Sequence, residues 1–170
     1  MPDLASFNEV ATEEARQELL KCCGAVRWAK TVERDRPYAS LEQLIAKAND
    51  VWWSLDETDW LEAFRSHPKI GERTAAHEVS AQSQQWSVQE QQGVQNAAHE
   101  AIEKLARLNV EYEKKFGFIF IVCATGKSSD EILALLEQRL PNDASTELPI
   151  AAAEQAKITE LRLRKLIEHS

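Results

Sequence analysis

Three places in the sequence combine reactive side chains with a constrained backbone, and the first is FRSHPKIGER, residues 64–73. His67 stands directly before Pro68, which drives the preceding residue out of helical geometry and so restricts where the imidazole can point. A histidine exchanges protons near neutral pH, as general acid-base catalysis requires. A second interpretation is a helix C-terminus, where a histidine suits the helix dipole. The residues alone leave both interpretations open.

The second place is SVQEQ, residues 87–91. Ser87 and Glu90 have the spacing of a capping box, in which each side chain satisfies a backbone amide at a helix start. A helix N-terminus also offers spare amides and a positive dipole end to an anionic ligand, so capping and binding can coexist. Gln91 adds an amide that can both donate and accept.

The third place is Arg162, within KITELRLRKL, residues 157–166. At about 100° per residue, with Ile158 at zero, Arg162 lies near ~40° and Leu166 near ~80°. The arginine therefore interrupts the apolar face of a predicted helix. A guanidinium in that position must find a carboxylate, because leaving it unpaired is costly. That carboxylate can belong to the protein or to a ligand.

Other apparent signals fail on closer inspection. ATGKS suggests a phosphate-binding loop, but the pattern requires a glycine five positions before Gly126, and Ile121 stands there. His77 and His99 both lack the second histidine of a zinc-protease helix. We therefore predict no metal.

Composition limits the classes of partner. The chain has 170 residues, 44% of them hydrophobic, and a formal net charge of -8. This predicts one domain over residues 1–170, and the acidic balance argues against nucleic acid or an anionic membrane as partner. The N-terminal residues lack signal-peptide character, which predicts a cytoplasmic protein. The three cysteines, an odd number, predict reduced thiols rather than a disulfide framework.

The sequence is helical in texture, and the predicted fold class is all-α, a compact single-domain bundle of about six or more helices. Ser40, Asp56, Ser128 or Ser129, and Thr146 are predicted to start helices. Residues 69–86 read as a long irregular loop, whereas the apolar run at 117–126 could be strand-like or helical. The predicted helices lie within residues 8–24, 41–55, 57–66, 87–116, 130–140 and 147–170.

Taken together, the three places resemble the 2-oxo-4-hydroxy-4-carboxy-5-ureidoimidazoline (OHCU) decarboxylases, which complete the oxidation of urate to (S)-allantoin. The His-Pro-x-Ile-Gly motif falls on residues 67–71, and Ser-x-x-Glu-Gln falls on 87–91. The aromatic-glycine-aromatic block begins FGFIFIVCATGKS at 116–128, and the final Arg-Leu pair is 162–163. The resemblance covers nearly the whole chain. One departure is Gln92, where the family often has a small residue.

The resemblance implies a cofactor-free, all-α decarboxylase acting on a small anionic ureido-imidazoline. It implies that His67 is the principal acid-base group, that Glu90 positions or tunes it, and that Arg162 pairs with substrate oxygens. A homodimer is compatible with the resemblance. The residues implied to line the substrate pocket are Pro68, Ser87, Gln91, Phe120, Ile121, Val122 and Cys123.

Two other interpretations remain open at the level of sequence. The main alternative is a helical module that binds a small ligand without catalysis, in which His67 only ends a helix and Arg162 pairs with an internal acid. Another is nucleotide binding at residues 126–128, which predicts thermal stabilisation by nucleotide.

Overall fold

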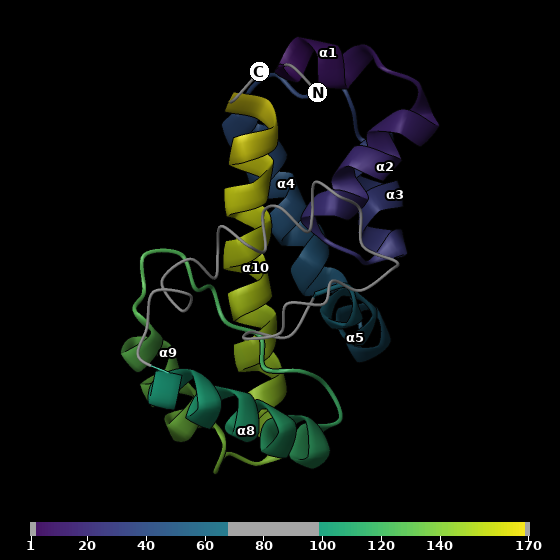
Figure 1. Cartoon of the computed structure of the whole chain (residues 1–170). Helices are drawn as coiled ribbons and strands as arrows, with labels where there is room; N and C mark the ends of the chain where they lie inside the picture. Colours follow the sequence, from purple (N-terminus) through teal and green to yellow (C-terminus); the bar gives the residue numbers. More distant parts are fainter. Residues whose placement is uncertain (1–2, 68–98, 169–170) are drawn as a thin grey trace. The chain divides into compact units, whose positions relative to one another are not determined.

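The computed structural model describes residues 3–67 and 99–168, and within those ranges every regular element is an α-helix (Figure 1). The predicted all-α fold class is therefore confirmed for the described part of the chain. The helices are α1 (Leu4–Glu9), α2 (Thr12–Cys22), α3 (Val26–Arg34), α4 (Leu41–Ser54), α5 (Glu57–Arg65), α8 (His99–Phe116), α9 (Ser129–Arg139) and α10 (Ala144–Glu168).

Side-chain caps fix several helix starts where the sequence predicted them. Ser40 and Ser128 precede α4 and α9, and each hydroxyl accepts from the backbone amide three residues on, at 3.1 Å in both cases. At α10 the capping side chain is Asp143, whose carboxylate accepts from the amide of Thr146 at 2.8 Å. The last helix therefore begins at Ala144, two residues before the predicted start at Thr146.

The N-terminal region differs from the prediction of one helix over residues 8–24. Val10 is extended, with φ -64° and ψ 160°, and it separates α1 from α2. Neither Val10 nor its neighbour Ala11 carries the turn chemistry of Gly or Pro, so no residue type at this point predicts the break. Helix α3 was also not predicted. Its buried face includes Trp28, Ala29 and Val32.

The described contacts group the chain into two compact units. The first unit runs to Ala63 and resumes at Ala156, and the second extends from Phe64 to Gln155. Helices α5 and α10 each contribute residues to both units. The single domain over 1–170 stays a prediction, and each unit is described below by itself.

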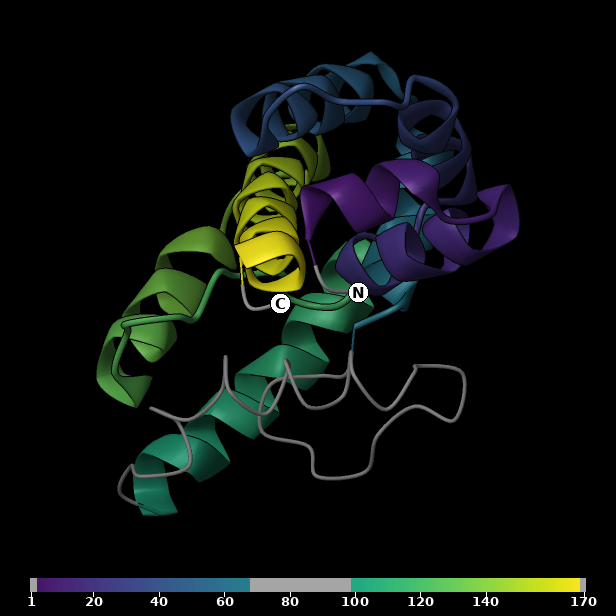
Figure 2. The same ribbon diagram turned by 90° about the horizontal axis from the view of Figure 1, so that it is seen from above.

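In the first unit, α2, α3 and α4 pack in sequence, as Figure 2 shows in purple to blue. The indole of Trp28 is fully buried and donates to the carbonyl of Ala48 on α4 at 3.0 Å. The Thr159 hydroxyl of α10 donates to the carbonyl of Cys22 at 3.5 Å, so the second half of α10 completes this core. Leu19, Leu44 and Leu163 are also fully buried there.

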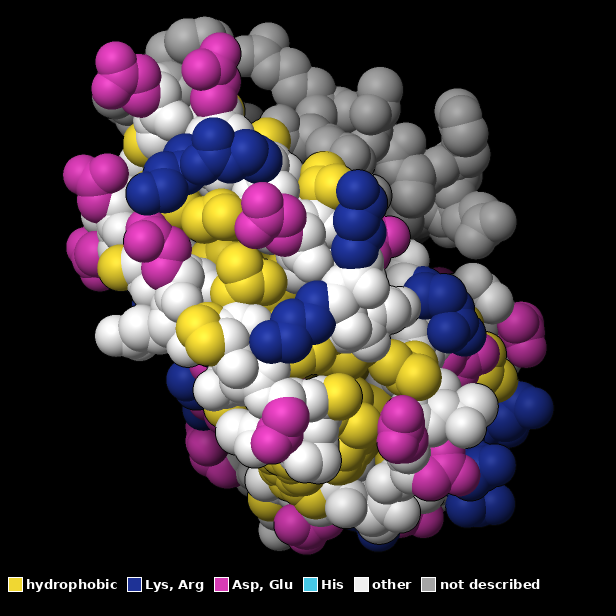
Figure 3. Space-filling view, turned by 90° about the horizontal axis from the view of Figure 1, so that it is seen from below, with side chains coloured by type: hydrophobic (Ala, Val, Ile, Leu, Met, Phe, Trp, Pro, Cys, Tyr) yellow, Lys and Arg dark blue, Asp and Glu magenta, His cyan; other side chains and the backbone are white. Residues whose placement is uncertain are grey.

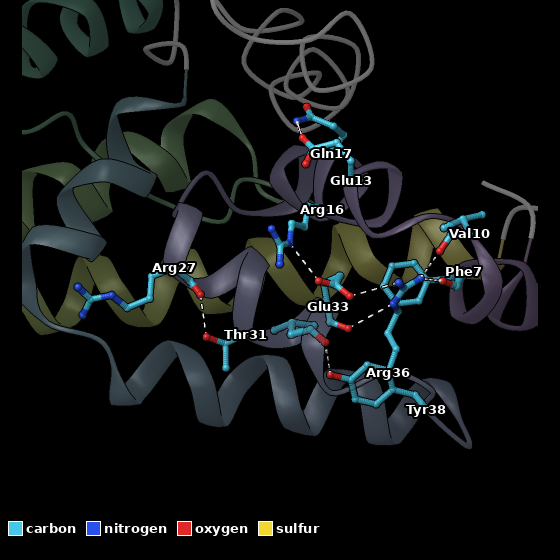
Figure 4. Close-up of polar contacts among 11 residues, drawn as sticks. Phe7, Val10, Glu13, Arg16, Gln17, Arg27, Thr31, Glu33, Arg36 and Tyr38 are labelled. Atoms are coloured by element: carbon cyan, nitrogen blue, oxygen red, sulfur yellow. Dashed lines mark hydrogen bonds and ion pairs between the residues drawn. The ribbon is translucent and has the colours of Figure 1, made fainter.

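A polar cluster joins the N-terminal helices of the first unit (Figure 4). Glu33 accepts from Arg16 at 3.0 Å and from Arg36 at 3.2 Å. The Arg36 guanidinium also donates to the carbonyls of Phe7 and Val10, at 2.7 and 2.9 Å. These bonds satisfy carbonyls at the end of α1, which a helix leaves without intrahelical donors.

In the second unit, α8 packs on α9, and the segment 117–128 runs between them in sequence without helix or strand. Gly117 ends α8 with φ +82°, a left-handed conformation that glycine adopts without strain. Its amide donates to the carbonyl of Glu113 at 2.8 Å, which satisfies one of the last helical acceptors. Gly126 has φ +78° at a second turn.

On the surface visible in Figure 3, Lys and Arg side chains are interspersed with Asp and Glu, and hydrophobic side chains appear between them. Positive and negative side chains are therefore mixed on that face. Among the described helices, none is both long enough and apolar enough to cross a membrane.

Candidate active site

His67 lies just beyond the end of α5, in the second unit. The helix ends at Arg65, close to the end predicted from Pro68. The backbone amide of His67 donates to the carbonyl of Phe64 at 3.2 Å. The imidazole is half-buried, and its Nε2 lies 2.6 Å from Oε1 of Gln155. His67 is thus a helix terminus whose ring is held by a second helix, α10.

The segment that follows α8 carries four predicted pocket residues, and all of them are buried. Phe120 and Ile121 are 2% exposed, Val122 is 5% exposed and Cys123 is 7% exposed. The prediction left open whether this run is strand-like or helical, and it is neither. An irregular buried segment must find partners for its backbone groups away from a regular ladder.

Side chains from α9, from α10 and from the end of the segment itself supply those partners. The amide of Cys123 donates to the Glu154 carboxylate on α10 at 3.0 Å, and its carbonyl accepts from the Lys127 ammonium at 2.9 Å. The carbonyl of Ile121 accepts from the Arg139 guanidinium of α9 at 2.7 Å. The path of the predicted pocket segment is therefore set by side chains that the sequence analysis did not select.

A buried polar network surrounds Arg139. Its Nε donates to Glu147 at 2.7 Å, the Tyr112 hydroxyl also donates to Glu147, and Asn142 donates to the same carboxylate at 3.1 Å. The guanidinium lies 4.6 Å from the ring centre of Phe120, a cation–π contact. Burial, and next the hydrogen bond to Glu147, raise the pKa of Tyr112. The network is saturated by protein groups, which favours a structural role.

Arg162 lies in the first unit and is only 3% exposed, so its predicted place in an apolar face is confirmed. It lies close enough to the thiols of Cys22 and Cys23 to act on their charge. Burial raises the pKa of both thiols, that of Cys23 to about 12, and the positive charge of Arg162 partly offsets this. Whether Arg162 serves a protein acid or a substrate stays a prediction.

Gln155 is a fully buried polar residue beside His67 that was not predicted from the sequence. On the helical wheel that places Ile158 at zero, residue 155 falls near ~60°, close to the angle of Arg162. Gln155 therefore lies on the same apolar face as Arg162, and its position in that face is the sequence signal that identifies it. The remaining predicted site residues, Pro68, Ser87, Glu90 and Gln91, lie outside the described residues.

The phosphate-loop fragment has structural functions instead. Gly126 forms the turn, the Lys127 amide donates to the carbonyl of Ala124 at 3.0 Å, and Ser128 caps α9. Within residues 3–67 and 99–168, no cluster of three or more His, Cys, Asp or Glu side chains has the arrangement of a metal site.

Comparison with known proteins identifies the class. Residues 8–164 match the family model for OHCU decarboxylase, and the chain therefore belongs to that family. The resemblance of the sequence motifs to this family is thereby confirmed.

Individual relatives agree with the family match. The chain is 42% identical over 159 residues to the uric acid degradation bifunctional protein TTL of Arabidopsis thaliana, covering 92% of this chain and 48% of that protein. It is 29% identical over 170 residues to the OHCU decarboxylase of Amia calva, covering 98% of this chain and 95% of that protein. The chain thus spans about half the length of the Arabidopsis relative.

A solved structure is similar as well. A crystal structure of OHCU decarboxylase in the presence of (S)-allantoin matches with a TM-score of 0.77 at 39% identity. The match covers 89% of this chain and 97% of that one, so the helical architecture is that of the family.

Proposed function

We propose that this chain catalyses the cofactor-free decarboxylation of OHCU to (S)-allantoin in urate degradation. The observation that carries the proposal is the family match over residues 8–164, which spans every motif singled out in the sequence. The 39% identity to an OHCU decarboxylase crystallised in the presence of (S)-allantoin supports the same substrate class.

The chemistry of this substrate requires modest assistance from the protein. When the carbon–carbon bond to the carboxylate breaks, carbon dioxide leaves and the electron pair enters the ring, where the imine accepts it and the imine nitrogen takes up a proton from solvent. The hydroxyl gives up its proton as the carbonyl forms, and a proton is delivered to one face of the adjacent carbon. A positioned acid-base group that controls that face would account for a single enantiomer.

In this proposal His67 is the acid-base group. Its position supports the role, because the ring sits at a helix end, is half-buried, and is held through one nitrogen by a buried side chain. Glu90 would position or tune His67, and Arg162 would pair with substrate oxygens. An ion pair that persisted unchanged would stabilise ground and transition states alike, so Arg162 is expected to act mainly on binding.

The proposed pocket lining comes from the family motifs. Phe120, Ile121, Val122 and Cys123 form a buried segment with fixed backbone direction, which suits a rigid wall. Pro68, Ser87 and Gln91 complete the proposed lining on the basis of the motifs alone.

The experiment measures the chirality of the product. Purified protein is added to urate, urate oxidase and hydroxyisourate hydrolase, and circular dichroism follows the allantoin formed, with His67→Gln in parallel. We expect a rapid chiral signal from the wild type and none from the folded variant. Loss of substrate alone is a poor readout, because spontaneous decay yields racemic allantoin.

The alternative, a helical binding module without catalysis, predicts a different outcome. Wild type and His67→Gln would then both give slow, racemic product in verified upstream reactions, and both would retain a ligand. That result would reject the decarboxylase.

Assembly and location are further parts of the proposal. We propose a homodimer and a cytoplasmic location, on the basis of the family resemblance and of the sequence respectively. Light scattering of the purified protein and fractionation of the cells that produce it are the corresponding measurements. A monomer across the working concentration range would reject the homodimer.

A further inference from the structure

We propose that Gln155 is a positioning residue that fixes the tautomer and direction of the His67 imidazole, leaving Nδ1 as the nitrogen that exchanges protons with the substrate. This inference rests on the proposed function, in which His67 is the acid-base group. It assigns a role to a residue outside the motifs and names the reacting atom of the histidine.

Nε2 of His67 lies 2.6 Å from the amide oxygen of Gln155, well within hydrogen-bond distance. An amide oxygen can only accept, so Nε2 must carry the hydrogen. In a neutral imidazole with a hydrogen on Nε2, the lone pair that can take a proton is on Nδ1.

Gln155 is 0% exposed, and its neighbours one turn earlier on α10, Ala151 and Ala152, are also fully buried. A glutamine amide in such a place is costly unless it is hydrogen-bonded. A residue needed only for packing would be better served by leucine or methionine, so the amide at this position indicates a requirement for its polar group.

Both residues of the contact are held by packed elements. Gln155 projects from the interior of a 25-residue helix. On the other side, the fully buried ring of Phe64 packs against Phe118, with ring centres 5.2 Å apart, and the His67 amide donates to the Phe64 carbonyl. A hydrogen bond between two such anchors fixes the direction of the imidazole.

The adjacent residue of α10 has a parallel task. Glu154 accepts from the amide of Cys123, in the segment proposed to line the pocket. Two consecutive residues of one helix therefore hold the proposed catalytic ring and the proposed wall.

The chemical type of the partner also matters. A carboxylate beside Nε2 would favour the imidazolium ion, whereas a neutral amide selects a tautomer without adding charge. The His67 imidazole must be uncharged to accept a proton near neutral pH. The neutral amide of Gln155 orients the ring without favouring its charged form.

The test begins with the wild-type protein and needs no activity. Nuclear magnetic resonance of isotope-labelled imidazole nitrogens, with the His67 signals assigned by their loss in His67→Gln, reports which nitrogen carries the hydrogen. We expect the Nε2–H tautomer in the neutral ring. An Nδ1–H tautomer would overturn the proposal.

Kinetics of two variants and a control provide the second arm. Gln155→Leu should lower kcat by about 10- to 100-fold with KM changed by less than about threefold, because ring orientation and not substrate affinity is lost. Its His67 resonances should become those of mixed tautomers. Gln138→Leu, the same substitution at an exposed position on α9, should leave kcat, KM and the pH profile unchanged.

Gln155→Glu separates positioning from simple structural support. It retains an acceptor oxygen, so kcat at alkaline pH should be partly restored relative to Gln155→Leu. The added charge should move the acidic limb of the kcat profile upward by about one pH unit, because it favours the imidazolium. This variant and the wild-type spectra carry the test if Gln155→Leu does not fold.

The outcomes distinguish this inference from the proposed function. A folded Gln155→Leu protein with wild-type kcat and an unchanged His67 tautomer would reject the role of Gln155 while the decarboxylase stands. A wild-type protein that forms no chiral allantoin would reject the proposed function, and the tautomer would still be decided by the spectra.

Discussion

Two arginines, Arg36 in the first unit and Arg139 in the second, perform the same task in different surroundings. Each pairs with a glutamate and donates to a backbone carbonyl of a non-helical or terminal stretch. Arg36 bonds Glu33 and the carbonyls at the end of α1, and Arg139 bonds Glu147 and the carbonyl of Ile121. In both cases a guanidinium supplies several fixed donors where the chain lacks regular backbone partners.

The two clusters differ in redundancy. Glu33 also binds Arg16, whose side chain is 31% exposed, so two cations share that carboxylate. Glu147 is 0% exposed, and among the described residues its ion-pair partner is Arg139. Similar bonds therefore have unequal consequences for stability. Removing one of two cations leaves the carboxylate paired, whereas removing a single cation leaves a buried unpaired charge.

The largest expected effect is that of Arg139→Met. The substitution strands the carboxylate of Glu147 in the interior and frees the carbonyl of Ile121. We expect a loss of about 3–5 kcal/mol in the free energy of unfolding, measured by urea denaturation at neutral pH. A loss below about 1 kcal/mol would mean that Tyr112 and Asn142 suffice to hold the carboxylate.

The matched change, Arg36→Met, should cost less. Glu33 keeps Arg16 at 3.0 Å, so the lost hydrogen bonds are those to three backbone carbonyls and one bond to the Glu33 carboxylate. We expect about 1–3 kcal/mol in the same urea experiment. The double variant Arg16→Met and Arg36→Met should cost more than the sum of the single changes, because Glu33 then loses both cations. Simple additivity would contradict the idea of redundancy.

The conservative change Arg139→Lys tests whether the buried cluster also supports catalysis. Lysine keeps the charge but cannot reach Glu147 and the Ile121 carbonyl with one planar fork. We expect kcat/KM for allantoin formation to fall by about tenfold, or ~1.4 kcal/mol, while Arg36→Lys leaves it unchanged. Equal effects of the two lysine variants would show that the segment at 120–123 does not depend on Arg139.

We expect the smallest change in stability from the ionisation of tyrosine. The chain has two tyrosines, and each unit contains one of them. Burial raises the pKa of both Tyr38 and Tyr112 above their ordinary value of 10.0. Each phenol is then protonated in the folded protein where it would ionise in the unfolded chain. The contribution of each buried phenol to the free energy of unfolding is fully present below pH about 10. It is lost as the pH rises toward the folded-state pKa.

Absorbance of the tyrosinate ion checks this expectation. The folded protein should show no titration near pH 10, and the urea-unfolded chain should titrate there. The variants Tyr38→Phe and Tyr112→Phe assign the absorbance change to one tyrosine or the other. Titration of either tyrosine near pH 10 in the folded state would indicate that its cluster admits water.

Sequence analysis succeeded where local chemistry decides. Ser40 and Ser128 cap α4 and α9 because a serine hydroxyl at a helix start accepts from the amide three residues on. This bond depends on the local backbone and not on distant parts of the fold. The end of α5 before Pro68 and the burial of Arg162 were likewise predicted from the covalent restriction of proline and from helical period.

It failed where packing decides. The break at Val10 carries no turn residue, and α3 was missed although its buried face includes Trp28. The irregular course of 117–124 could not be derived either, because its backbone partners, Arg139, Glu154 and Lys127, lie on other elements or beyond a turn.

Sequence patterns alone predicted the helical class, the ends of α4, α5 and α9 to within one residue, the family and the candidate catalytic residues His67, Glu90 and Arg162. These depend on spacing along the chain, which periodicity and motifs record. Which side chains hold the candidate residues depends on packing between elements that are far apart in the sequence. The bond from His67 to Gln155 joins positions 88 residues apart, and no local rule pairs them. Burial created the need for that bond, since a fully enclosed amide must find its partner within the fold.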